Sequence, residues 1–144
     1  MNRRDLIKLI AAATGTAFVS SNALAYSILP QVEVKNTGFS NKDLMLLNEI
    51  GESILPRTDT PGAKDADVSK MMAIMVADCY SAEERQVFMQ GLQTLQTRTQ
   101  DKYKKEFLLL SSEQRFEMLS MLDQEARIYN NHENTVPHYF SLIK

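Results

Sequence analysis

The fold is decided by how its helices begin, first in the stretch Phe39-Ser40-Asn41-Lys42-Asp43-Leu44. The hydroxyl of Ser40 can accept a hydrogen bond from the backbone N–H of Asp43, and the Asp43 carboxylate can reach back to the backbone N–H of Ser40. This reciprocal pair is a capping box, and Phe39 and Leu44 bracket it as a hydrophobic staple. The stretch therefore predicts the first turn of an α-helix. The helix should end near Leu55, because Pro56 follows.

The same signal recurs twice along the chain. Ser81 is followed three residues later by Glu84, and Ser111 by Gln114. Between the first two boxes, residues 68–80 form a strongly apolar segment of helical length, and no segment alternates with the period of two that marks a strand. We therefore predict an all-α domain, a small bundle of four or five helices. The apolar spacing predicts these core-facing residues: Leu44, Leu47, Ile50, Ile54, Val87, Phe88, Gly91, Leu92, Leu95, Phe116, Leu119, Leu122, Ala126 and Tyr129.

The last nine residues carry an apolar group that is hard to bury. Pro137 suits a first helical turn, but one or two turns cannot bury the group alone. Two interpretations stay open: the segment packs onto a partner, or the natural protein continues beyond Lys144. The apolar residues are Tyr139, Phe140, Leu142 and Ile143.

The amino terminus has the three parts of a twin-arginine export signal. Arg3 and Arg4 precede an apolar run at residues 9–19, which is too short for a membrane span of roughly 20 residues. Ala23 and Ala25 then give the small-x-small pattern of a signal peptidase site. We expect residues 1–25 to be a cleavable signal peptide, residues 26–38 an extended leader and residues 39–144 a single helical domain. The predicted localisation is the periplasm.

Charge and cysteine content exclude several classes of function. Removing residues 1–25 takes away three basic residues and one acidic residue, which leaves 13 basic and 17 acidic residues and a net charge of −4. No clustered basic face for nucleic acid is present. Cys79 is the only cysteine, so an internal disulfide and a cysteine-bound cluster are excluded, and its apolar neighbours predict a buried, inert thiol. Nor does the chain contain the glycine motif of a Rossmann site, the haem attachment motif or a serine nucleophile elbow.

The connector at residues 55–67 is the unusual internal stretch. Pro61-Gly62 fits the centre of a type II turn, in which glycine takes a positive φ. Thr58, Asp59 and Thr60 can bind neighbouring backbone amides and hold one loop shape. From the residues alone, a rigid connector between helices explains the stretch better than a binding loop. A calcium site at its aspartates is disfavoured, because their spacing does not match an EF-hand.

The block at residues 49–66, with Pro56-Arg57-Thr58-Asp59-Thr60-Pro61-Gly62-Ala63-Lys64 at its centre, closely resembles the hallmark of the gluconate 2-dehydrogenase subunit 3 family. The likeness extends over about residues 39–144 and includes Phe88 with Gly91-Leu92 and Gln114-Arg115. The resemblance also covers the twin-arginine start. Members of the family usually continue past the position of Lys144, with a further segment that this sequence lacks.

The resemblance implies a non-catalytic small subunit with no cofactor of its own. Its partner would be a large flavoprotein of the glucose-methanol-choline type that carries FAD and oxidises a sugar or sugar acid, often beside a multihaem cytochrome c. The small subunit would escort that flavoprotein to the twin-arginine translocase, and the complex could be attached to the membrane. It also implies a partner-docking loop formed by Pro56, Arg57, Thr58, Asp59, Thr60, Pro61, Gly62 and Lys64. The alternative is a stand-alone periplasmic helical binding module without an oxidoreductase partner.

Overall fold

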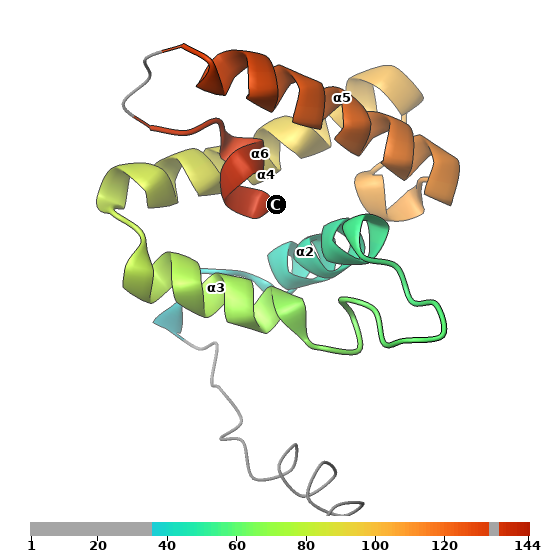
Figure 1. Cartoon of the computed structure of the whole chain (residues 1–144), viewed down its shortest axis with the longest axis horizontal. Helices are drawn as coiled ribbons and strands as arrows, with labels where there is room; N and C mark the ends of the chain where they lie inside the picture. The colour runs from blue at the N-terminus through green and yellow to red at the C-terminus, as the bar shows by residue number, and fades with distance from the viewer. Residues whose placement is uncertain (1–35, 133–135) are drawn as a thin grey trace, which may run out of the picture. The chain divides into compact units, whose positions relative to one another are not determined.

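The computed structural model describes residues 36–132 and 136–144, and within them it contains α-helices, one short 3-10 helix and no strand (Figure 1). The predicted all-α fold with four or five helices is confirmed. The export arginines Arg3 and Arg4, the cleavage residues Ala23 and Ala25, and residues 26–35 of the predicted leader lie outside the described residues. The elements are α2 (Asn41–Ile54), α3 (Val68–Cys79), α4 (Ala82–Tyr103), η2 (Phe107–Leu109), α5 (Ser112–Asn130) and α6 (Tyr139–Ile143).

All three predicted capping boxes open helices. Both reciprocal hydrogen bonds are present at the first residues of α2, α4 and α5. The box before α4 lowers the pKa of Glu84, because its carboxylate accepts a hydrogen bond from the Ser81 backbone N–H. These caps fix where each helix starts, and so they set the lengths of the connectors between helices.

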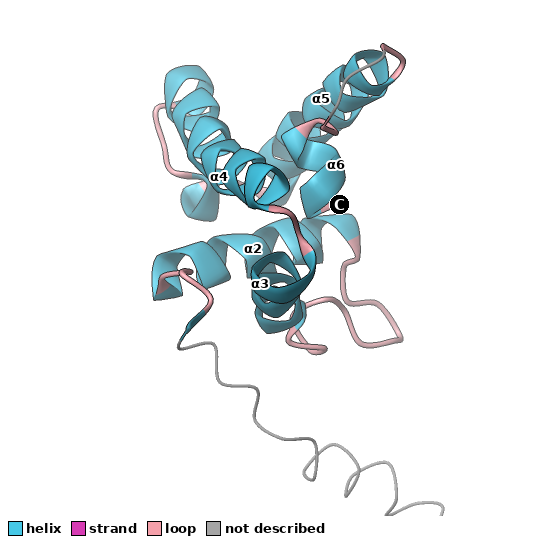
Figure 2. Ribbon diagram, turned by 90° about the vertical axis from the view of Figure 1, so that its left-hand side faces the viewer, coloured by secondary structure: helices cyan, strands magenta, loops and turns pink. Residues whose placement is uncertain are grey.

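The core forms where α4 meets the other helices. Phe88 is fully buried, and its ring makes edge-on contacts with the rings of Phe39 and Tyr80 at 5.8 and 6.2 Å between centroids. Around it, α2 packs on α3 and α5, while α4 packs on α6 (Figure 2). Most of the predicted core residues are buried. The main exceptions are Ile54, Phe116 and Tyr129, which are exposed.

The exceptions on α5 have a geometric cause. The buried side of α5 runs through Met118, Leu122 and Ala126, and Phe116 lies off this stripe with 69% of its surface exposed. Tyr129 belongs to the last helical turn, where its ring contacts the imidazole of His138 at 5.5 Å instead of entering the core. The prediction that both aromatic residues are buried was wrong.

Helix α3 exposes several of its apolar residues and Cys79, which was predicted to be buried. It packs through Ser69, Ala73 and Val76, the small or short residues of its sequence. Met71 and Met75 are therefore exposed, and so is Cys79. The expected buried thiol is wrong, since an apolar helix that contacts the core along one narrow face leaves its other faces in solvent.

The C-terminal segment is buried within its own chain. Helix α6 packs on α4 and α5, and its Phe140 and Ile143 are only 2% and 3% exposed. Tyr80 donates a hydrogen bond to the Leu142 carbonyl at 3.1 Å, and Asn130 accepts one from the His138 backbone N–H at 3.0 Å. The expectation that this group needs a partner or a longer chain for burial was wrong, because α4 and α5 bury it. Among the described residues, no helix has both the length and the apolar character needed to cross a membrane.

We expect the docking of α6 to depend on pH through His138. Its Nδ1 accepts a hydrogen bond from the Phe140 backbone N–H at 3.3 Å, which requires that atom to be unprotonated. Burial lowers the pKa of His138 below its ordinary value of 6.5; Glu125 opposes and Arg98 adds to this shift, while Tyr129 and Tyr139 face the ring. As the pH falls through 6.5, the unfolded chain binds the proton first, so the free energy of unfolding should fall.

We expect urea unfolding at pH 7.5 and pH 5.5, values chosen to bracket that pKa, to show a larger loss of stability for the wild type than for His138→Asn. Asparagine is a good N-cap residue that does not titrate in this range. An equal loss in both proteins would show that His138 is not the group responsible.

Candidate functional site

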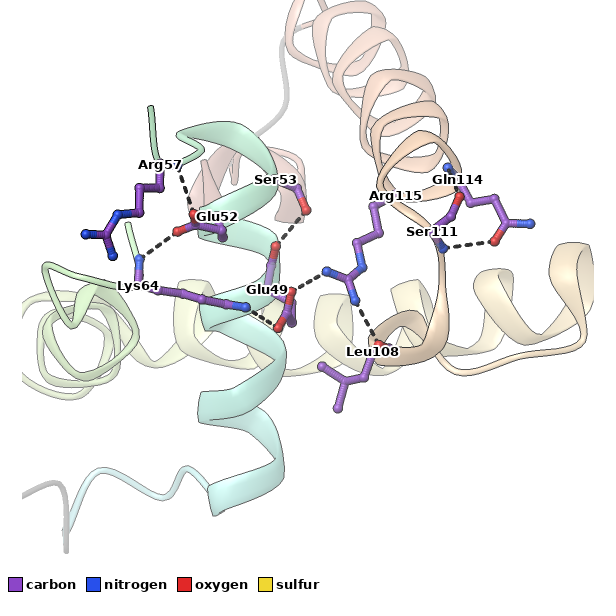
Figure 3. A network of polar contacts seen from close by, with 9 residues as sticks. All are labelled: Glu49, Glu52, Ser53, Arg57, Lys64, Leu108, Ser111, Gln114 and Arg115. Carbon is purple, nitrogen blue, oxygen red and sulfur yellow. Dashed lines mark hydrogen bonds and ion pairs between the residues drawn. The ribbon is translucent and has the colours of Figure 1, made fainter. Parts of the chain in front are cut away.

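The connector between α2 and α3 is closed by the carboxylate of Glu52. Its Oε1 accepts a hydrogen bond from the Arg57 backbone N–H at 2.9 Å, and its Oε2 accepts one from the Lys64 backbone N–H at 3.0 Å (Figure 3). These two bonds lower the pKa of Glu52, the Lys64 bond more than the Arg57 bond. One side chain at the end of α2 thus ties the two ends of the loop together.

Gly62 is required because a side chain at this position would not fit, and not because of its φ angle. Among the described glycines only Gly38 has a positive φ, 81°, so the predicted type II turn at Pro61-Gly62 is wrong. A Cβ atom on Gly62 would lie 2.6 Å from the Arg57 backbone nitrogen and 2.7 Å from Glu52 Oε2. The glycine backbone therefore packs closely against the Glu52 carboxylate that closes the loop. The Gly62 N–H donates a hydrogen bond to the Asp65 carboxylate at 2.9 Å.

The tip of the loop is held less firmly than its base. The Thr58 backbone N–H donates to the Thr60 carbonyl at 3.1 Å, and the return contact from the Thr60 N–H to Thr58 Oγ1 is long, at 3.5 Å. Asp59 makes no hydrogen bond or ion pair with any described residue, so the expected binding of backbone amides by its side chain is wrong. The acids that bind the loop amides are Glu52 and Asp65.

The predicted docking residues divide into a buried base and an exposed tip. Gly62 is buried, and every other member of the predicted set is exposed. The Arg57 guanidinium pairs with Asp65 at 2.9 Å but keeps 69% of its side chain in solvent. The structure therefore leaves the tip accessible. The exposed members are Pro56, Arg57, Thr58, Asp59, Thr60, Pro61 and Lys64.

A second carboxylate connects the loop to α5. Glu49, one turn before Glu52, forms ion pairs with both Lys64 and Arg115 (Figure 3). Arg115 also donates to the Leu108 carbonyl at 2.8 Å and lies over the Phe107 ring at 5.8 Å. Glu49 and Arg115 are each less than one-fifth exposed.

Sequence reasoning missed Glu49, Glu52 and Arg115 as site residues. The available signal was the spacing of the two glutamates. They lie three residues apart on one face of α2, directly before a loop that carries Arg57 and Lys64.

Two apolar grooves flank the start of this loop. The first has a volume of about 480 Å³ and lies between α2, α3 and α6, with Leu55, Met72 and Met75 among its lining residues. The second, of about 400 Å³, lies between α2, α5 and α6 and is lined by Phe116, among others. Ile54 and Lys144 line both grooves, so the two form one continuous surface, which we call the Ile54 surface.

Comparison with family models matches residues 41–144 to the family described as gluconate 2-dehydrogenase subunit 3. The chain belongs to this family. The match spans every helix from α2 to α6, and so it includes the loop and the Ile54 surface of this subunit 3 chain. Searches of curated proteins and of solved structures gave no significant match. The family resemblance expected from the sequence is confirmed.

The polar groups that hold the loop and α6 of this subunit 3 chain bind other parts of the protein. Its glutamates accept loop amides and pair with basic side chains, and His138 caps α6. Within residues 36–132 and 136–144, no three His, Cys, Asp or Glu side chains gather in a way that could hold a metal ion. The arrangement is suited to presenting a rigid loop beside an apolar surface.

Replacing Glu52 with alanine should loosen the loop. We expect Glu52→Ala to lower the free energy of unfolding by about 1–2 kcal/mol, because two backbone N–H groups lose a charged acceptor and only water replaces it. Glu52→Gln keeps one acceptor oxygen and should lose roughly half as much. Gln90→Ala, an exposed substitution on α4, should change stability by less than about 0.5 kcal/mol.

Urea unfolding measures these differences, and hydrogen exchange at the Arg57 and Lys64 amides locates them. If exchange at both amides is as slow in Glu52→Ala as in the wild type, Glu52 does not close the loop.

Proposed function

We propose that this chain is the non-catalytic small subunit of a periplasmic flavin-dependent dehydrogenase that oxidises a sugar or sugar acid such as gluconate. It escorts the catalytic subunit through twin-arginine export and supports assembly of the complex. Membership in the subunit 3 family over residues 41–144 carries this proposal. The Arg3-Arg4 signal in the sequence and the rigid, exposed loop support it.

The proposal places the redox chemistry in other chains. FAD belongs to the large flavoprotein of the glucose-methanol-choline type, and haem, where present, to a multihaem cytochrome c. The partners are therefore the flavoprotein, the cytochrome and the twin-arginine translocase, and nucleic acid is not among them. The complex is periplasmic, and any membrane attachment comes through its other subunits.

The alternative is a stand-alone periplasmic binding module. A free-standing module should be stable and soluble alone, whereas a subunit exposes apolar side chains that its partner covers on assembly. The described surface exposes Ile54, Leu55, Met75 and Phe116 along the two grooves. This favours the subunit, and it predicts that the isolated chain self-associates at high concentration. A chain that stays monomeric in sedimentation at all concentrations would favour the module.

The test is to purify the chain from the periplasm of its native host, with an affinity tag joined to Lys144 by a long flexible Gly/Ser linker. We expect a flavoprotein without its own signal peptide to copurify in equal amount, identified by mass spectrometry and by the flavin absorbance spectrum. An exported, well-expressed chain that brings no flavoprotein would contradict the proposal.

A further inference from the structure

The Ile54 surface is apolar at its centre. Exposed fractions are 41% for Ile54, 62% for Leu55 and 46% for Met75, so the described chain leaves about half of these apolar side chains in solvent. The surface is concave, since these side chains line two grooves that meet at Ile54. A concave apolar surface binds a protruding apolar segment better than a flat apolar surface does.

The rim of this surface presents positive charge, although the whole chain has a net charge of −2. Arg127 and Lys144 line the grooves, and Arg57 and Lys64 stand beside the lining residues Leu55 and Ala63 in the chain. In the ion pairs of these four basic residues, the basic side chain is at least twice as exposed as its acidic partner. Arg115, which shares Glu49 with Lys64, is the exception, since it and the glutamate are equally buried. Exposures of the basic and acidic side chains are 69% and 32% for Arg57–Asp65, 44% and 19% for Lys64–Glu49, 74% and 24% for Arg127–Asp123, and 49% and 24% for Lys144–Asp123.

Ion pairs away from the surface have no such bias. Lys102 is 34% exposed and its partner Glu117 56%, while Lys70 and its partner Asp67 are 44% and 57% exposed. The outward-facing basic groups are thus a property of the rim and not of the composition. They can meet carboxylates of a partner while their own acidic partners stay beneath them.

We propose that the Ile54 surface binds an acidic, amphipathic segment of the catalytic flavoprotein subunit, with the segment's apolar side chains against Ile54 and Met75 and its carboxylates against Arg127 and Lys144. This inference rests on the proposed function and specifies the surface and the chemistry of its partner. A second copy of the chain fits less well, because a two-fold contact through this surface would bring its own basic rims together, and self-association is therefore expected only at high concentration. A flat anionic membrane fits less well, because the apolar centre is recessed in two grooves.

Aspartate substitutions test the apolar centre. The purified flavoprotein is titrated with the wild-type chain and with Ile54→Asp and Met75→Asp, and the dissociation constants are measured by calorimetry. We expect each variant to bind at least about 30-fold more weakly, because a charge is buried in the contact. Leu109→Asp is the matched control, since Leu109 is 70% exposed and lines neither groove, and it should change binding less than about 3-fold. Circular dichroism and thermal unfolding verify that each variant is folded.

Charge reversal tests the rim independently. Arg127→Glu should weaken binding about 5- to 10-fold at low salt and less at high salt, because a rim charge is screened. Lys42→Glu, on a side chain that is 62% exposed and does not line the Ile54 surface, should leave the dissociation constant unchanged.

The outcomes separate this inference from the proposed function. If the wild-type chain binds no flavoprotein, the proposed function fails and this inference with it. Wild-type affinity in the folded Ile54→Asp and Met75→Asp variants would overturn the inference alone. The same variants are also tested for binding to vesicles of phosphatidylcholine and phosphatidylglycerol. If they lose vesicle binding but keep wild-type flavoprotein binding, the surface contacts a membrane and the inference is wrong.

Discussion

Phe88→Ala is expected to lower the free energy of unfolding by about 3–5 kcal/mol, the loss usual for a fully buried phenylalanine. Phe88 is 0% exposed and touches the rings of Phe39 and Tyr80, so alanine would leave a cavity between α3, α4 and the start of α2. A domain of this size has a total stability of about 5–15 kcal/mol, so the variant should lose a large share of it. Urea unfolding followed by circular dichroism measures the change.

Phe116→Ala is the matched control for Phe88→Ala. Phe116 is 69% exposed, so its removal should change the free energy of unfolding by less than about 0.5 kcal/mol. Because Phe116 lines the Ile54 surface, the same substitution should weaken partner binding instead. Equal destabilisation by the two substitutions would show that α5 packs with a different face than the structure gives.

Gly91→Ala is expected to destabilise the domain by about 1–3 kcal/mol, because the pocket for α6 is already full. A Cβ atom on Gly91 would lie 2.5 Å from the Cβ and Cγ atoms of Tyr139, close to the backbone of α6 where no rotation relieves the clash. Helix α6 would have to move away from α4, and Phe140 and Ile143 would lose part of their burial.

Gly51→Ala provides the comparison for Gly91→Ala. Both glycines lie inside helices, so both substitutions gain roughly 1 kcal/mol of helix propensity. The Cβ atom on Gly51 would meet only the Cβ of Ala63, at 3.2 Å, a contact that a small shift relieves. Gly51→Ala should therefore be neutral or mildly stabilising in thermal unfolding. If Gly91→Ala is the more stable of the two, α6 does not dock on α4 as described.

Local signals in the sequence were enough to predict the helices. A capping box depends on residues three apart, and Ser40, Ser81 and Ser111 each started a helix where predicted. Which face of a helix is buried depends instead on its neighbours. Helix α3 is apolar on most sides, and only its contacts with α2 and α4 show that Ala73 is inside and Met71 outside. The burial of α6 likewise depends on a surface made by α4 and α5, which no local pattern records.

The loop was located from the sequence, but the forces that hold it were not. The resemblance identified the Arg57 to Lys64 block, and the family match confirms the family without testing the docking role. The prediction for Gly62 assumed a turn with positive φ, whereas the structure uses the missing side chain to let Glu52 approach the backbone. Such close approaches join residues that are ten positions apart, and propensity rules for neighbouring residues do not capture them.

The most direct test of the central claim is to remove this chain from its native host and measure where the flavoprotein goes. Cells are fractionated and the flavoprotein is quantified in periplasm and cytoplasm. We predict that it stays in the cytoplasm without this chain, that the wild-type chain restores its export, and that a chain with Arg3→Lys and Arg4→Lys does not. A flavoprotein that reaches the periplasm in equal amount without this chain would contradict the account.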